Sequence, residues 1–289
     1  MLLTGDLGFT VVERFAERFP DRFFNVGVAE QNMLGVATGL AEAGFIPFAY
    51  SIATFATLRP LEFARNGPGL HQYPVRLIGI GAGFEYGPAG FSHHAIEDVA
   101  IMRALDSFRI IAPADCAQAV SALRATWNLA GPIYYRVSKN DRLEIPPLDG
   151  RFRLGEVEIV VDGGDVLLLT LGAASAEGAD AVASLGGRGV RATWAVVADL
   201  GEATRTALRA LVTRFGHAVT IEAHVESGGL AAMVAEIIAT SGLGTRLIRC
   251  GVQREHLFRN GSEEYLLNLH GLKGVQIADR VSATLRGPD

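Results

Sequence analysis

The residue best placed to do chemistry is a carboxylate at the start of a helix built from small residues. Positions 25–44 read NVGVAEQNMLGVATGLAEAG, and this run of small and apolar side chains predicts a helix over 29–43. A helix that is apolar all round is buried on all sides, so Glu30 brings a charge to a buried position. Such a carboxylate is held by backbone amides or by a partner that requires it, unless the helix start is solvated at a domain edge.

Two glycines in the same helix point to close packing. Gly35 and Gly39 are four residues apart and therefore lie on one face. Because glycine costs about 1 kcal/mol relative to alanine inside a helix, two of them indicate a face that packs against another backbone.

A glycine-rich loop and a charged strand supply the other candidates. Positions 81–94 read GAGFEYGPAGFSHH, which places the adjacent pair His93 and His94 beside Glu85 and Tyr86. Adjacent histidines in a loop are solvated, structural or ligand-binding. Arg136 lies within IYYRV, and an arginine in a buried strand needs either a salt bridge, here to another domain, or a ligand at the carboxyl end of the sheet.

Strands and helices that alternate along the whole chain must position these residues. Short β-branched runs predict strands at 76–81, 109–112, 132–137, 165–171, 192–197 and 218–221. Apolar residues at helical spacing predict helices at 13–19, 29–43, 96–105, 117–129, 175–184, 202–215, 229–240 and 282–286. The segment EIPPLDG at 144–150 is a linker. We therefore expect two α/β domains, 1–145 and 146–289, each with a mostly parallel sheet covered by helices on both faces.

Composition excludes several classes of function. The chain has 289 residues, 49% hydrophobic and 20% charged, with a net charge of −5, which argues against nucleic-acid binding. No apolar run reaches the roughly 18 residues of a membrane span, and the charged residues Asp6, Glu13 and Arg14 leave no secretory signal. Two cysteines 134 positions apart, Cys116 and Cys250, suit neither a disulfide framework nor a zinc site. A cytoplasmic location is the expectation.

Several short motifs together resemble the transketolase family of thiamine-diphosphate enzymes. The segment GVAEQN at 27–32, followed by the small-residue helix, resembles the family's pyrimidine-binding segment. Other segments that resemble the family are TGDLG at 4–8, YSIATF at 50–55, the loop and its continuation at 81–98, PAD at 113–115 and EAHVESGGL at 222–230. The resemblance covers essentially the whole chain.

The resemblance implies a role for each candidate residue. Glu30 would hydrogen-bond the aminopyrimidine of thiamine diphosphate, Phe55 would stack on that ring, and Asp6 would lie near the thiazolium. His93 would contact the donor sugar hydroxyls, with His94 near it. A carboxyl group in Glu30's role must be buried so that it keeps or shares its proton near neutral pH.

A phosphate contact is implied for Arg136 by resemblance to deoxyxylulose phosphate synthase, a relative. Arg59 and Arg65 are weaker phosphate candidates. The loop is longer than in single-chain transketolases and carries Glu85 and Tyr86, which changes the expected recognition of acceptors.

The family's diphosphate and Mg²⁺ are held by a separate domain with a Gly-Asp-Gly motif, and this sequence lacks that pattern. The resemblance is therefore to the C-terminal subunit of a split transketolase, which would need an N-terminal partner in an α2β2 heterotetramer. The face of Gly35 and Gly39 would pack at that interface. Members of the family also have a helix before the strand that ends in Asp-Leu, and this sequence begins within that strand.

We expect transfer of a two-carbon ketol unit between sugar phosphates, with the pentose phosphates as the default substrates. Two alternatives stay open. The β-subunit of a 2-oxo-acid dehydrogenase carries a similar motif on a separate chain, although the histidine pair and Arg136 favour sugars. A non-catalytic transketolase-like subunit would keep the fold without turnover.

Overall fold

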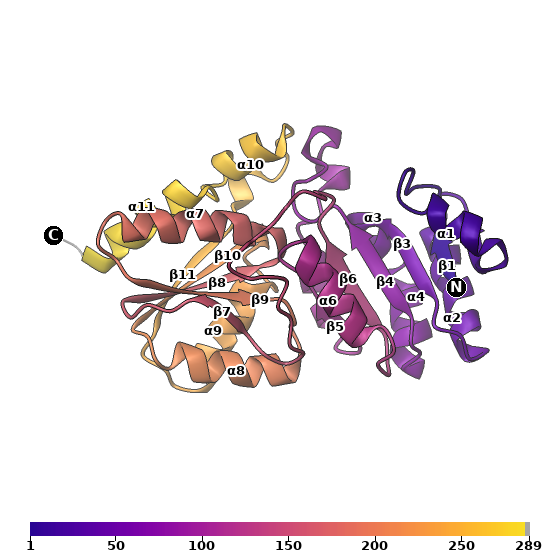
Figure 1. Cartoon of the computed structure of the whole chain (residues 1–289), viewed down its shortest axis with the longest axis horizontal. Helices are drawn as coiled ribbons and strands as arrows, with labels where there is room; N and C mark the ends of the chain where they lie inside the picture. Colours follow the sequence, from indigo (N-terminus) through magenta and orange to yellow (C-terminus); the bar gives the residue numbers. More distant parts are fainter. Residues whose placement is uncertain (287–289) are drawn as a thin grey trace.

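The apolar strand segments of the sequence form two separate sheets in the computed structural model, which describes residues 1–286. The two α/β units lie side by side along the long axis of the molecule. The N-terminus is at one end of that axis and the C-terminal helix is at the other (Figure 1).

The first sheet has six parallel strands in the order β2-β1-β3-β4-β6-β5. The strands are β1 (Leu2–Thr4), β2 (Phe23–Asn25), β3 (Phe48–Ile52), β4 (Arg76–Ile80), β5 (Arg109–Ile111) and β6 (Ile133–Val137). From β1 the chain turns to β2 on one side and then returns to β3 on the other. The gap between the carboxyl ends of β1 and β3 is therefore the point where an open α/β sheet places its ligands.

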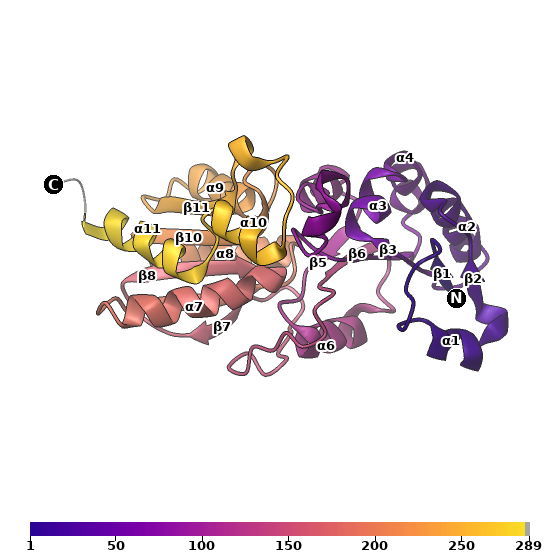
Figure 2. The same cartoon turned by 90° about the horizontal axis from the view of Figure 1, so that it is seen from above.

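Helices cover both faces of this sheet. They are α1 (Glu13–Arg18), α2 (Glu30–Glu42), α3 (Ala53–Leu58), α4 (Leu61–Ala64), α5 (Asp98–Ala104) and α6 (Cys116–Thr126). Figure 2 shows α2, α3 and α4 on one side of the sheet and α1 and α6 on the other. Leu3, Ala49 and Leu77 of the sheet are buried in one core with Met33 and Leu34 of α2.

The second sheet has five strands in the order β11-β10-β8-β9-β7, and only the edge strand β7 is antiparallel. The strands are β7 (Glu158–Val161), β8 (Val166–Leu171), β9 (Ala192–Val197), β10 (His217–Val225) and β11 (Arg246–Val252). The helices are α7 (Ser175–Gly186), α8 (Glu202–Val212), α9 (Leu230–Thr240), α10 (Glu263–Leu269) and α11 (Gly274–Arg286). In Figure 1, α7 and α11 cover one face of the sheet, and α8 and α9 cover the other.

The predicted fold class is confirmed, since both units are α/β with parallel-dominated sheets. The sequence patterns did not predict the short strands β2 and β3, the edge strands β7 and β11, or the helices α3, α4 and α10. The expected boundary at 145/146 lies in the segment 138–157, which carries neither helix nor strand.

One prediction about α2 is wrong within this chain. Met33, Leu34 and Ala37 are buried, but the opposite face, which carries Gly35, Val36 and Gly39, is exposed. A Cβ added at Gly39 would meet nothing within 4 Å. This chain therefore covers only half of a helix whose composition predicts burial on all sides.

The two units are joined by backbone hydrogen bonds as well as by side chains. Ala112 donates to the carbonyl of Ala198 at 2.8 Å, and Leu200 donates to the carbonyl of Ile110 at 3.1 Å. Asp199 lies between these bonds and is fully buried. The carboxyl ends of β5 and β9 thus form a continuous hydrogen-bonded junction.

None of the helices in residues 1–286 combines the length and the apolar character that crossing a membrane requires.

Candidate functional site

Glu30 lies at the switch point of the first sheet. It is the first residue of α2, and its side chain is only 1% exposed. Its carboxylate accepts a hydrogen bond from the Ser51 hydroxyl of β3 at 3.0 Å and forms an ion pair with the Arg59 guanidinium at 2.8 Å. A Cβ on Gly5, which follows β1, would stand 3.4 Å from the Glu30 carboxylate, so a glycine there lets the strand end approach the acid closely.

Phe55 provides an aromatic face beside this carboxylate. It lies on α3, which begins directly after β3, and its ring is half-buried. The Cζ atom of Arg59 lies 3.7 Å from the centroid of the Phe55 ring. A planar cation therefore packs on Phe55 and donates to Glu30 at the same time.

His93 joins this group from the glycine-rich loop. Its ring centroid is 4.9 Å from that of Phe55, with the rings at 67°. Its Nδ1 lies 3.0 Å from the Ser92 hydroxyl. A backbone bridge between Gly83 and Ala95 closes the loop at its base, which fixes where His93 meets the sheet.

Asp6 lies at the rim of the same region, exposed to solvent. Its φ of +59° is in the left-handed region, which an aspartate tolerates better than most residues. Its backbone amide donates to the Asn25 side chain at 3.1 Å, and the Asn25 amide group donates back to its carboxylate at 2.9 Å. This reciprocal pair joins the carboxyl ends of β1 and β2.

The loop carries a second buried acid, Glu85. It accepts hydrogen bonds from the backbone amide of Lys139 at 2.7 Å and from the Ser138 hydroxyl. Burial raises the pKa of Glu85, and these hydrogen bonds oppose the shift. The ammonium of Lys139 lies 4.4 Å from the centroid of the Tyr86 ring. Glu85 therefore ties the loop to the end of β6.

The structure does not bring His94 to this group. Its side chain is 1% exposed, its ring packs edge-on against Phe84, and its Nε2 lies 3.3 Å from the carbonyl of Gly87. Burial lowers the pKa of His94. Neighbouring residues in the loop point to opposite sides, so only His93 faces Phe55.

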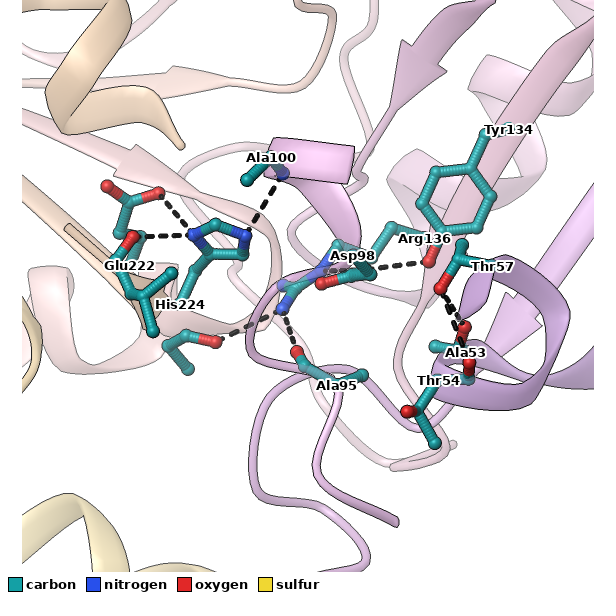
Figure 3. A network of polar contacts seen from close by, with 12 residues as sticks. Ala53, Thr54, Thr57, Ala95, Asp98, Ala100, Tyr134, Arg136, Glu222 and His224 are labelled. Carbon is teal, nitrogen blue, oxygen red and sulfur yellow. Dashed lines mark hydrogen bonds and ion pairs between the residues drawn. The ribbon is translucent and has the colours of Figure 1, made fainter. Parts of the chain in front are cut away.

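Arg136 is also turned away from Glu30 and Phe55. Its guanidinium pairs with buried Asp98 at 2.8 Å and donates to the carbonyls of Ala95 at 2.8 Å and Ala223 at 3.1 Å (Figure 3). Ala223 belongs to the second unit, so Arg136 makes an interdomain hydrogen bond. Its salt bridge, however, is to Asp98 of its own unit, whereas the alternative interpretation of this charge expected one to the other domain. This geometry does not support phosphate contacts by Arg136 or substrate contacts by His94.

The sequence patterns did not predict that Ser51 would hydrogen-bond Glu30 or that Asn25 would hold Asp6. They indicated Arg59 only as a phosphate candidate. Asn25 and Ser51 lie within the segments that resemble the family's pyrimidine-binding and aromatic segments, which was the available signal. Among residues 1–286, no cluster of three or more histidine, cysteine or acidic side chains is arranged to hold a metal ion.

Comparison with known proteins agrees with this fold. Residues 1–142 match the family described as transketolase, pyrimidine binding domain, and residues 155–277 match transketolase, C-terminal domain. The chain belongs to the transketolase family, and both of these domain models match it.

The relatives include short chains of similar length. The chain is 35% identical to the putative transketolase C-terminal section of Methanocaldococcus jannaschii, over 99% of this chain and 90% of that one. It is 29% identical to one of the subunits of the apulose-4-phosphate transketolase of Actinobacillus succinogenes, over 92% and 85%. Among solved structures, a split gene transketolase described as an inactive beta4 tetramer matches with a TM-score of 0.88 and 33% identity, over 99% and 92%.

Proposed function

We propose that this chain is the C-terminal subunit of a two-chain transketolase, which uses thiamine diphosphate to transfer a two-carbon ketol unit between sugar phosphates. The observation that carries the proposal is the pairing of a fully buried carboxylate, Glu30, with an aromatic face, Phe55, at the switch point of the sheet. The match to the pyrimidine binding domain and the names of the two relatives support it.

The residues present fit the aminopyrimidine half of the cofactor. That ring is planar and, when protonated, donates from its edge to a carboxylate. The Arg59 guanidinium has the same two properties, and it donates to Glu30 at 2.8 Å while it packs 3.7 Å from the Phe55 centroid. A flat cationic group is thus accommodated against both residues.

Each residue then has a definite task. When bound, thiamine diphosphate supplies a carbon acid that becomes the nucleophile toward the carbonyl of a donor ketose. Glu30 holds a proton at the pyrimidine nitrogen, Ser51 orients the carboxyl group, and Phe55 fixes the ring plane. His93 contacts the donor hydroxyls, and Asp6, held by Asn25, lies near the thiazolium. We assign His94 and Arg136 to positioning of the loop rather than to contact with substrate.

A partner subunit completes the site. We propose that an N-terminal transketolase subunit holds the diphosphate and Mg²⁺, and that the two kinds of chain form an α2β2 assembly. The exposed face of α2 with Gly35, Val36 and Gly39 supports an interface there, because it is apolar and closely approachable. The relatives named as a C-terminal section and as one subunit of a transketolase support a divided enzyme.

Reconstitution with the N-terminal subunit tests the function. The mixed chains are assayed with thiamine diphosphate, Mg²⁺, a ketose phosphate donor and an aldose phosphate acceptor. We expect turnover only from the mixture. Glu30→Gln should lower kcat by about 10²–10⁴-fold. Glu17→Gln, on an exposed residue of α1 away from the proposed interface, is the control and should leave it unchanged.

The other outcomes separate the alternatives. Ketol transfer that survives Glu30→Gln would refute the catalytic assignment. Decarboxylation of a 2-oxo acid with acyl transfer to a lipoyl domain, in place of ketol transfer, would identify a dehydrogenase β-subunit. Absence of both reactions in a mixture that assembles would identify a non-catalytic subunit.

A further inference from the structure

Arg59 makes the two contacts that the proposed cofactor ring would need. Its Nη1 lies 2.8 Å from the Glu30 carboxylate, and its Cζ lies 3.7 Å from the Phe55 centroid. The two contacts together fix the orientation of the guanidinium. The ion pair with Glu30 fixes one of its edges, and the packing on Phe55 fixes its plane. A ring that takes the same carboxylate edge and the same aromatic face cannot be present together with this guanidinium.

The Arg59 side chain has room to move away from Glu30 into solvent. Arg59 is 37% exposed, whereas the carboxylate that it pairs with is 1% exposed. Arg59 follows the last residue of α3 and lies next to Leu58, which is itself 47% exposed. Its long stem therefore has a path to solvent that requires no movement of the sheet or of α3. Glu30, in contrast, is held by its place in α2 and by Ser51.

We propose that Arg59 is a displaceable internal competitor for the pyrimidine pocket, which holds Glu30 and Phe55 in their places until the cofactor ring takes over both contacts. The inference rests on the proposed function, because it assumes that the ring binds at these residues. It assigns Arg59 a role distinct from the phosphate contact that its sequence position suggested.

The pairing has two physical consequences. A buried carboxylate without a partner is costly, so Arg59 keeps Glu30 satisfied in the unassembled chain. The same pairing weakens cofactor binding. The apparent affinity equals the intrinsic affinity multiplied by the fraction of molecules in which Arg59 has left the pocket, and the ion pair makes that fraction small. Removal of Arg59 should therefore tighten binding, which is the opposite of what a direct ligand or a supporting residue would do.

Calorimetric titration of thiamine diphosphate with Mg²⁺ into the complex with the N-terminal subunit tests this inference. Compared with wild type, we expect Arg59→Ala to bind about tenfold more tightly, which corresponds to about 1.4 kcal/mol. Arg59→Gln, which keeps a planar donor without the charge, should fall between them and guards against a folding defect in the alanine variant. Arg124→Ala, on the exposed face of α6, should match wild type.

Chemical modification gives a readout that does not depend on affinity or activity. Phenylglyoxal labelling of Arg59, mapped by mass spectrometry, should speed up when thiamine diphosphate is added to the wild-type complex. Unchanged or weaker binding by Arg59→Ala, or protection of Arg59 by the cofactor, would overturn the inference. If neither wild type nor any Arg59 variant binds thiamine diphosphate, the proposed function itself fails.

Discussion

Two neighbouring histidines illustrate how much depends on the direction of a single side chain. His93 faces Phe55, whereas His94 is buried against Phe84. From the sequence we expected both histidines in the site, because two adjacent loop residues give no sign of which side each side chain faces. Glu30 could be singled out from the sequence as a charge within a run of small residues, but its role was implied only by the resemblance of that segment to the family's pyrimidine-binding segment. Its partner Arg59 is 29 residues away, and only the fold brings the two together.

Alanine substitution separates the two histidines. His93→Ala should lower kcat/KM for the ketose donor by about 10–100-fold, because the variant loses a contact with the reacting sugar. His94→Ala should instead lower the melting temperature, because it leaves a cavity beside Phe84. Steady-state kinetics and thermal unfolding of both variants check this. An equal loss of kcat/KM in the two would contradict the assignment.

Some of the helices and strands can be predicted from the sequence, and others cannot. Periodicity identified long helices such as α2 and α9, but three-residue strands such as β2 are too short to show a period. A buried carboxylate also fixes the start of a helix in the second domain. Buried Glu222 of β10 accepts hydrogen bonds from the Leu230 and Ala231 amides at the start of α9, each at 2.8 Å (Figure 3 shows Glu222 and its neighbours).

The capping acid predicts a pH dependence of stability. Burial raises the pKa of Glu222 to about 7, against hydrogen bonds that lower it. Because the folded pKa lies above the ordinary value, the stability contribution is complete below pH 4.5 and is lost as the pH rises through 7. The loss is on the order of 3 kcal/mol. Glu222→Gln should therefore remove a contribution that lowers the melting temperature as the pH rises from about 4.5 to 7.

His224 lies two residues further along β10, and its pKa is shifted in the opposite direction, so it predicts the opposite dependence of stability on pH. Burial lowers the pKa of His224 to about 4, so its contribution is complete above pH 6.5 and is lost as the pH falls through 4. Because the two contributions oppose each other over nearly the same pH range, they largely cancel in the wild-type protein. His224→Gln should therefore reveal a fall in melting temperature between about pH 4.5 and 7, and Glu222→Gln should reveal a rise between about pH 4 and 6.5. The same pH profile of melting temperature in both variants would contradict the two assignments.

The open face of α2 predicts where the partner binds. Gly39→Leu should stabilise the isolated chain by about 0.5–1 kcal/mol, because glycine is replaced inside a helix where nothing obstructs the new side chain. The same change should abolish assembly with the N-terminal subunit, because the bulk prevents close approach. Gly186→Ala, at a helical glycine that is also unobstructed, is the control and should affect stability alone. Analytical ultracentrifugation reports assembly, and normal assembly of Gly39→Leu would place the interface elsewhere.

At the scale of the whole molecule, the arrangement of the two domains was beyond sequence patterns. Many of the contacts that fix it end on backbone carbonyls, such as those from Arg136 to Ala223 and from Arg103 to Gly228, 87 and 125 residues apart. Every residue has a backbone carbonyl, so a contact that ends on one cannot be recognised from the amino-acid sequence. The sequence did predict two parallel-sheet units, because alternation of strands and helices is itself a property of residue order.

The buried ion pair between Arg136 and Asp98, beside the hydrogen bond from Arg136 to the second domain, predicts a large contribution to stability. Arg136→Met leaves Asp98 buried with only the Tyr134 hydroxyl at 2.6 Å, and should cost about 3–5 kcal/mol. Arg191→Ala breaks an exposed pair with Asp165 and should cost less than about 1 kcal/mol. Denaturant unfolding measures both. If Arg136→Met is no less stable than Arg191→Ala, the buried pair does not stabilise the protein.

The central claim is that this chain supplies the pyrimidine half of a thiamine diphosphate site that a second subunit completes. Calorimetric titration of the cofactor with Mg²⁺ into the chain alone, the complex, and the complex with Glu30→Gln tests it most directly. We predict saturable binding by the complex, binding at least tenfold weaker with Glu30→Gln, and none by the chain alone. Equal affinity with and without the Glu30 carboxylate, or full affinity in the chain alone, would contradict it.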